Sequence, residues 1–225
     1  MKKIGMIVAV EIQAVLDKYG AQLKESQQCG FRVLEVSAPN YEMVIVSSGA
    51  GEIAAAAATQ FLISAHHVDL IVNFGVVGGL TPAMAKTKAS IVEKVVHYDY
   101  DVSQIDNVLP GQYEAYPDRY IPVTQSLLKK ALALRPELVP VVCASGDKFV
   151  GSAEGKIALH ETCGADICEM EAAGIVLTCN RNNVPCMLIK IVSDGITGGA
   201  EEFRETKDAT AAMCLDIISA VIDDL

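Results

Sequence analysis

The chain has 225 residues, with 18 basic and 28 acidic side chains and a net charge of −10. Because phosphate contacts need clustered lysine and arginine, this balance argues against nucleic acid as a partner and favours a small molecule. Hydrophobic residues make up 51% of the chain, yet no run approaches the ~18 apolar residues of a membrane helix, so we expect no membrane partner.

Apolar runs and helical patterns alternate along the chain. Strands are predicted at 4–10, 31–36, 43–48, 70–74, 90–97, 139–144 and 186–192. Helices are predicted at about 52–65, 124–133, 154–162, 169–181 and 207–222. This alternation predicts an α/β fold with helices on both faces of a sheet, and no linker divides the chain, so we expect one domain, 1–225.

Polar, glycine-bearing loops follow several of these strands. They comprise 49–51, 75–79, 145–151 and 193–199. In open α/β sheets the ligand lies beyond the carboxyl ends of the strands. The sequence therefore predicts that these loops meet at one cleft.

Five motifs in order resemble those of one family. They are Ser48-Gly49-Ala50-Gly51, Gly75-Val76-Val77-Gly78-Gly79-Leu80, Ser145-Gly146-Asp147-Lys148-Phe149-Val150-Gly151, Glu169-Met170-Glu171-Ala172 and Ile191-Val192-Ser193-Asp194. Together they resemble the purine nucleoside phosphorylase and nucleosidase superfamily, and within it the 5′-methylthioadenosine/S-adenosylhomocysteine nucleosidases. The resemblance implies three αβα layers around a central mixed, twisted β-sheet. It also implies a purine nucleoside as the ligand, no cofactor, and a homodimer or higher homo-oligomer.

The resemblance assigns a role to several residues. Asp194 would bind and protonate purine N7, and Glu171 would accept hydrogen bonds from the ribose hydroxyls. Met170 would pack on the sugar, Phe149 would stack on the purine, and the backbone of Val150 would read its Watson–Crick edge. The remaining substrate-binding positions are Val76, Glu169, Lys190 and Ser193.

Glycosidic bond cleavage explains why two carboxyl groups are needed. Breaking the C–N bond builds positive charge on the ribose and negative charge on the leaving base. An acid near N7 relieves the charge on the base, and it stays protonated at neutral pH only if its surroundings favour the neutral form. A carboxylate beside the ribose favours the developing cation. Taken singly, Glu171 also fits a surface helix position, and Asp194 fits the start of a turn.

The nucleophile side departs from the family pattern. Counting from Gly5, the catalytic glutamate of the nucleosidases falls on Gln13, with Glu11 two residues earlier. A glutamine can position a water molecule but cannot take its proton. Val76 stands at a serine position and Lys190 at an arginine position. Ile105 and Asn107 stand where the nucleosidases place aromatics for the 5′ group.

Three functions remain open at this stage. The first is hydrolysis of a purine nucleoside of the methylthioadenosine or adenosylhomocysteine type, slowed by ~10²–10⁴-fold if Gln13 replaces the base. The second is phosphorolysis, which the lack of arginine at 8–14 and just before Gly75 disfavours, because arginine binds phosphate bidentately. The third is nucleoside binding with little or no catalysis.

The cysteines and the N-terminus bear on the compartment. The seven cysteines are odd in number and scattered, which favours buried free thiols over disulfides or zinc. No histidines have ligand spacing, so no metal is expected. Met1 to Val10 contains two lysines and an apolar run, but Glu11 follows at once and no cleavage site appears. We therefore expect a cytoplasmic protein.

Overall fold

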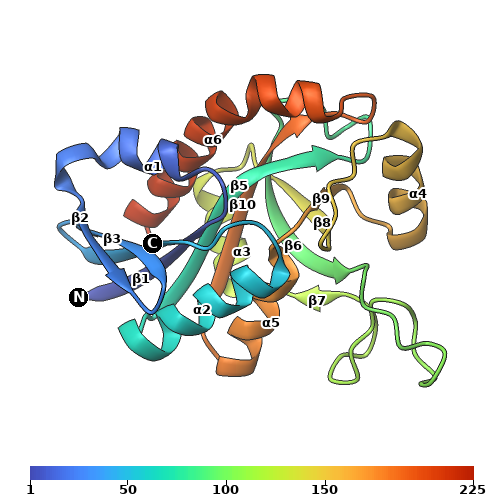
Figure 1. Ribbon diagram of the computed structural model, residues 1–225, viewed down its shortest axis with the longest axis horizontal. Coiled ribbons are helices and arrows are strands. Elements are labelled where there is room, and N and C mark those ends of the chain that lie inside the picture. The colour runs from blue at the N-terminus through green and yellow to red at the C-terminus, as the bar shows by residue number, and fades with distance from the viewer.

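The computed structural model describes residues 1–225 (Figure 1). Its strands are β1 (Lys2–Val8), β2 (Lys24–Gln28), β3 (Phe31–Ser37), β4 (Tyr41–Ser47), β5 (Leu70–Gly79), β6 (Ala89–His97), β7 (Ile121–Pro122), β8 (Val139–Ser145), β9 (Ile167–Glu169) and β10 (Cys186–Asp194). Its α-helices are α1 (Ile12–Tyr19), α2 (Glu52–His66), α3 (Gln125–Leu134), α4 (Ala153–Cys163), α5 (Ala172–Asn182) and α6 (Ala200–Asp223), with a 3₁₀ turn at Gly20–Gln22. No helix is long and apolar enough to cross a membrane.

All ten strands belong to one mixed sheet. From β5 outwards the order is β1, β4, β3 and β2; β1 pairs parallel with both β5 and β4, whereas β3 pairs antiparallel with its two neighbours. On the other side, β5 pairs with both β9 and β10. Because β6 and β8 join β10 to β9, these five strands close into a ring. The mixed sheet expected from the family resemblance is confirmed.

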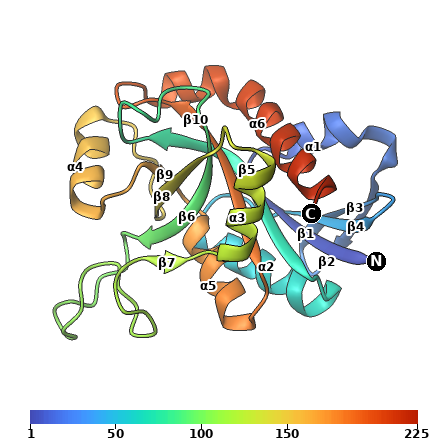
Figure 2. The ribbon, with the colours of Figure 1, turned by 180° about the vertical axis from the view of Figure 1, so that it is seen from behind.

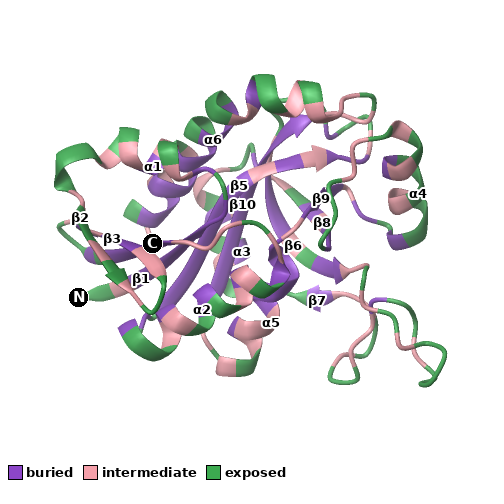
Figure 3. Ribbon diagram, viewed as in Figure 1, coloured by how far each residue is buried: buried purple, intermediate pink, exposed green.

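Helices cover both faces of the sheet. Helices α2 and α5 pack on one face, and α1, α3 and α6 contribute to the core of the other (Figures 1 and 2). Strand β10 is buried along its whole length (Figure 3). Both faces of such a strand are covered, which is why Cys186–Val192 is apolar without alternation except at Lys190.

Predicted element boundaries differ most from the structure at three places. The segment 75–79, expected as a turn, continues β5, because Gly78 and Gly79 pair with β9. Helix α5 begins only at Ala172, since Glu169 ends β9. Helix α6 begins at Ala200 rather than 207. Helix α1, of eight residues, and the polar edge strand β2, of five, had no predicted counterpart, because both are short.

Candidate active site

The segments after β1, β4, β8, β9 and β10 and the last part of β5 surround one cavity of about 130 Å³. Most of the predicted site residues line it: Val76, Phe149, Val150, Glu169, Met170, Glu171, Ser193 and Asp194. Glu11 lines it as well. Gln13 and Lys190 are not part of the lining.

Asp194 ends β10 and is held by a buried lysine. Lys156 of α4 has no exposed surface, and its Nζ donates to Asp194 Oδ2 at 2.5 Å. The same ammonium donates to the carbonyl oxygens of Asp194, Gly195 and Gly198 at 3.3, 2.6 and 3.0 Å. Ser193 Oγ donates to Asp194 Oδ1 at 2.8 Å. The Lys156 ammonium and the Ser193 hydroxyl therefore stabilise an Asp194 carboxylate that is shielded from solvent.

Two aromatic side chains stand beside Asp194 in the cavity wall. Phe149, 48% exposed, packs edge-on against Phe203 of α6, with ring centroids 5.5 Å apart at 67°. An exposed ring supported on one side offers an apolar face to a planar ligand. Phe149 therefore lies where a base could stack.

Glu171 stands at the N-terminus of α5, facing the loop before α2. Its Oε1 accepts the backbone N–H of Gly51 at 2.9 Å. Burial, reinforced by the neighbouring Glu169 carboxylate, raises the pKa of Glu171 to about 8. The Lys190 ammonium and the Gly51 N–H oppose that rise. Glu171 is thus a buried acid. A polyhydroxyl ligand or a nearby positive charge would favour its ionised form.

Glu169 has a structural role next to Glu171. Its Oε2 accepts from the backbone N–H groups of Glu171 and Ala172 at 3.1 and 3.0 Å, and from Lys190 Nζ at 3.1 Å. Burial alone would raise the pKa of Glu169, but Lys190 and the hydrogen bonds lower it below its ordinary value. Burial would likewise lower the pKa of Lys190, but Glu169 and Glu171 raise it well above the ordinary value. Glu169 therefore stays ionised and holds Lys190 behind the cavity wall.

Glu11 occupies the side of the cavity where a nucleophile was expected. It follows β1, is 8% exposed, and accepts the backbone N–H of Val76 on Oε1 and that of Val10 on Oε2, both at 3.0 Å. A Cβ on Gly75 would lie 3.1 Å from Glu11 Oε1 and 3.5 Å from Lys190 Nζ. The missing side chain at Gly75 leaves room for both charged groups to approach the same point.

Gln13 lies elsewhere, which corrects the expectation that it stands at the nucleophile. Helix α1 begins at Ile12, so Gln13 is on its first turn. The side chain is exposed, and its Nε2 donates to Asp17 Oδ1 one turn later at 2.7 Å. The position selected by counting from Gly5 thus faces solvent, and Glu11 presents the carboxylate. Ile105 and Asn107, expected near the 5′ group, also lie outside the lining, and Ile105 is 82% exposed.

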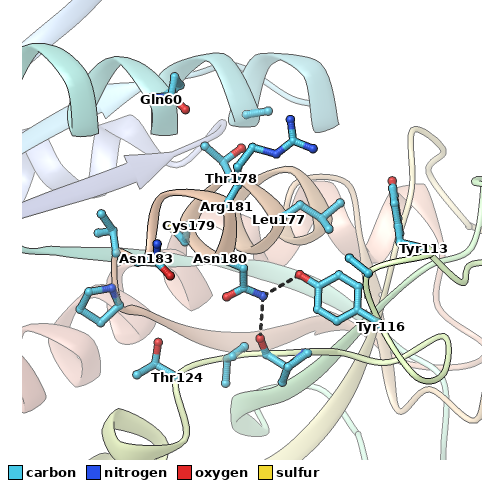
Figure 4. A pocket seen from close by; sticks show the side chains of 16 residues that line it. Gln60, Tyr113, Tyr116, Thr124, Leu177, Thr178, Cys179, Asn180, Arg181 and Asn183 are labelled. Carbon is cyan, nitrogen blue, oxygen red and sulfur yellow. Dashed lines mark hydrogen bonds between the residues drawn. The ribbon is translucent and has the colours of Figure 1, made fainter.

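A larger groove of about 980 Å³ lies between α5 and the segment 113–124 (Figure 4). In it, Asn180 Nδ2 donates to Tyr116 Oη at 3.0 Å and to the Pro122 carbonyl at 3.1 Å. None of the predicted site residues and no carboxyl side chain lines this groove. The groups able to perform acid–base chemistry are therefore in the smaller cavity.

Comparison with known proteins identifies the family of the chain. The model of the phosphorylase superfamily matches residues 3–223. The chain belongs to the phosphorylase superfamily. Within that superfamily it is 28% identical to a 5′-methylthioadenosine/S-adenosylhomocysteine nucleosidase of Staphylococcus aureus, over 99% of this chain and 100% of the relative.

Solved structures from the phosphorylase superfamily superpose along the whole chain. A Helicobacter pylori futalosine hydrolase has a TM-score of 0.92 at 26% identity, covering 100% of this chain and 98% of that one. A Helicobacter pylori 5′-methylthioadenosine/S-adenosylhomocysteine nucleosidase, in complex with a substituted pyrrolidin-3-ol, has a TM-score of 0.92 at 26% identity, with coverage of 100% and 99%. A Colwellia psychrerythraea nucleosidase in complex with adenine has a TM-score of 0.89 at 25% identity, with coverage of 100% and 96%.

Two residues of the candidate active site, Lys156 and Glu11, were not identified from the sequence. Lys156 carries no motif and reaches Asp194 from a helix 38 positions earlier. Glu11 did carry a signal, because it is the first charged residue after a buried strand, where ligand-binding side chains of α/β sheets gather.

Proposed function

We propose that the protein hydrolyses the N-glycosidic bond of a purine nucleoside of the 5′-methylthioadenosine or S-adenosylhomocysteine type, releasing adenine and a ribose derivative. One observation carries the proposal: four carboxyl groups line a single cavity, and the three not bound to Lys190, namely Asp194, Glu171 and Glu11, stand in three different electrostatic settings. Such differences let carboxyl groups in one site take opposite roles.

The base and the ribose are assigned to the two acids that the sequence singled out. Asp194, beside the aromatic Phe149, takes up a proton from solvent when the nucleoside binds and passes it to purine N7 as the C–N bond breaks, which returns Asp194 to the carboxylate. The Lys156 ammonium, 2.5 Å away, then stabilises the carboxylate that remains. Glu171 binds the ribose hydroxyls, and its ionised form favours the positive charge that develops on the sugar.

Glu11 is the proposed general base. Its carboxylate takes a proton from the attacking water, whose oxygen forms the new bond to the anomeric carbon while the bond to the base breaks. Lys190, close to Glu11 at Gly75, supplies positive charge on this side. In this proposal the exposed Gln13 takes no part, so its identity no longer argues for a protein that binds without catalysis.

The relatives support hydrolysis over phosphorolysis. Those named above are nucleosidases and a hydrolase, and one of them was solved with adenine. The cavity contains no arginine. Lys190 is engaged by Glu169, so it is not available as a dedicated phosphate ligand.

The experiment measures free base after incubation with methylthioadenosine, adenosylhomocysteine, adenosine and inosine, each with and without phosphate. We expect release of adenine from the first two substrates at the same rate in both buffers. A strict requirement for phosphate would replace this proposal with phosphorolysis, and tight binding without turnover would replace it with a nucleoside-binding protein.

The assembly and the compartment are also proposed. We place the protein in the cytoplasm because all seven cysteines are free and six are buried, as suits a reducing compartment. We propose a homodimer, as the family resemblance implies, with Ile53 and Ile105, 83% and 82% exposed, as candidate contact residues. Sedimentation equilibrium tests this: a monomer across micromolar concentrations would contradict it.

A further inference from the structure

Glu52, the first residue of α2, is a buried carboxyl group that the proposed reaction does not use. It is 6% exposed. Its Oε2 accepts the backbone N–H of Gly174 in α5 at 2.5 Å, and its own backbone N–H donates to Asp147 Oδ1 at 2.8 Å. Its Oε1 makes a short contact with Ser145 Oγ. Glu52 therefore joins the start of α2 to α5 and to the end of β8.

A count of hydrogens shows that this arrangement needs one more proton than Ser145 supplies. Ser145 Oγ lies 2.5 Å from Glu169 Oε1 as well as against Glu52 Oε1, and it accepts the backbone N–H of Ala173 at 3.0 Å. A hydroxyl carries one hydrogen and can donate to one carboxylate only. One of the two carboxyl groups must therefore donate to Ser145.

Glu52, rather than Glu169, is the group that carries this proton. Glu169 accepts a lysine and two backbone N–H groups, which hold its pKa below the ordinary value. Glu52 has no cationic partner, and burial together with the Glu169 charge raises its pKa to about 7. In the resulting series of hydrogen bonds, the Glu52 carboxyl donates to Ser145 Oγ, and the Ser145 hydroxyl donates to Glu169.

The link from Glu52 reaches the ribose end through two backbone positions. Gly51, which precedes Glu52, donates its N–H to Glu171 Oε1. Gly174, which contacts Glu52, lies in the first turn of the helix that Glu171 begins, and a Cβ there would collide with the Glu52 backbone. The distance between the starts of α2 and α5 thus sets the contact that orients Glu171.

We propose that Glu52 is a positioning residue for Glu171, and that the proton it shares with Ser145 keeps the starts of α2 and α5 together. When Glu52 loses this proton, two carboxylates face one hydroxyl hydrogen and repel each other. The two helix starts then separate, and the Gly51 contact with Glu171 weakens. Only the last step, the effect on ribose binding, rests on the proposed function.

Several other ionisable groups surround Glu52. Those facing it or sensing its charge are Glu169 of β9, Asp147 after β8, Tyr98 after β6, Tyr113 of the segment before β7, and Cys143 of β8, with Lys190 and Glu171 behind Glu169. Of these, Lys190 is the only cation, and it contacts Glu169 rather than Glu52. The negative charge that forms when Glu52 loses its proton therefore has no cation beside it.

The variant Glu52→Gln tests the proposal, because its amide keeps a donor towards Ser145 and an acceptor for Gly174 but does not titrate. A carboxyl whose pKa is raised on folding stabilises the fold at low pH, and that stability is lost as the pH rises through the folded value. The pKa of Glu52 rises from the ordinary value of 4.5 to about 7 on folding. As the pH increases through this range, the unfolding equilibrium constant of wild type, divided by that of Glu52→Gln, should rise by roughly a hundredfold. Urea unfolding at several pH values measures it.

The same pair of proteins tests the link to Glu171. With methylthioadenosine as substrate, kcat/KM of Glu52→Gln relative to wild type should rise about tenfold from pH 6 to pH 8, as wild-type Glu52 ionises. Titration of Glu171 itself occurs in both proteins and cancels in the ratio. Glu42→Gln, which removes an exposed carboxylate from β4, is the matched control and should follow wild type.

Each negative result has a distinct meaning. A stability ratio that does not change with pH overturns the assignment of the proton to Glu52. A stability ratio that changes as expected, beside a constant kcat/KM ratio, overturns the link to Glu171. Wild type that releases no base contradicts the proposed function alone, and the unfolding experiment still decides where the proton resides.

Discussion

The carboxyl groups of the cavity differ in what stands beside them. Lys156 contacts Asp194, Lys190 contacts Glu169, and Glu11 is held by two backbone N–H groups. Glu171 receives a single backbone N–H, and its pKa of about 8 reflects its burial beside Glu169. Chemically identical side chains thus acquire separate functions from their neighbours.

Glu11→Gln should lower kcat for methylthioadenosine by ~10²–10⁴-fold, the usual effect of losing a general base. The amide keeps the size of the side chain and an acceptor for Val76 N–H, so substrate affinity should change little. Gln13→Ala is the control from the same segment and should keep wild-type activity, because Gln13 is exposed, lies outside the cavity and hydrogen-bonds through its side chain to Asp17. If Gln13→Ala lost activity and Glu11→Gln did not, the assignment of the base would be reversed.

Lys156→Met should destabilise the fold by about 3–5 kcal/mol, since it leaves the Asp194 carboxylate buried without its counter-charge. The free energy of unfolding in urea measures the loss. The double variant Lys156→Met/Asp194→Asn should recover most of that stability while remaining inactive. Equal stability of the single and double variants would show that the ion pair does not account for the effect.

At the same scale, the structure brings Asp194 and Glu171, predicted to bind the substrate, to one cavity, whereas Gln13, predicted on the nucleophile side, lies outside it. Asp194 and Glu171 stand in motifs at the ends of β10 and β9, so their convergence follows from the topology of the sheet. Gln13 was selected by counting residues from Gly5. That count does not reveal that α1 begins at Ile12, which turns position 13 to solvent and leaves Glu11 facing the cavity.

Among the elements, the fully buried strands were the easiest to predict and the glycine-rich segment the hardest. β1 and β10 are apolar runs covered on both faces, and their composition alone indicates this. The segment 75–79 has the composition of a turn, but pairing with β9 and β10 keeps it in the sheet. Pairing partners come from distant segments, and local composition does not report them.

The packing of α2 against α5 gives a prediction for these elements. Gly174→Ala should destabilise the protein by about 1–3 kcal/mol, the usual cost of overpacking, although alanine is the better helix former by about 1 kcal/mol. The added methyl group would collide with the Glu52 backbone. Urea unfolding measures the change. A variant as stable as wild type would show that the two helices can separate freely.

The long-range contacts of α2 and α4 explain why part of the site was invisible in the sequence. Lys156 and Asp194 are 38 positions apart, and Glu52 and Ser145 are 93 apart. Neither lysine nor glutamate is distinctive on a helix, where both usually face solvent. Only the folded arrangement shows that these two are buried and what they contact.

For the whole molecule, the closed ring of β5, β10, β6, β8 and β9 brings β5, β9, the end of β10 and the segment after β8 to one cavity. β1, next to β5, adds Glu11 to the same edge. The helical layers exclude water from the charged groups, which strengthens each electrostatic contact. A net charge of −10 and a cavity without arginine suit a neutral or cationic nucleoside better than a phosphorylated one.

The central claim is that water, activated by Glu11, attacks a purine nucleoside bound by Glu171 and Asp194. It is tested most directly by cleaving methylthioadenosine in ¹⁸O-labelled water with phosphate present and analysing the sugar product by mass spectrometry under conditions that suppress exchange. Hydrolysis should give a free methylthioribose that carries the label at its anomeric oxygen. A methylthioribose 1-phosphate without the label would contradict it.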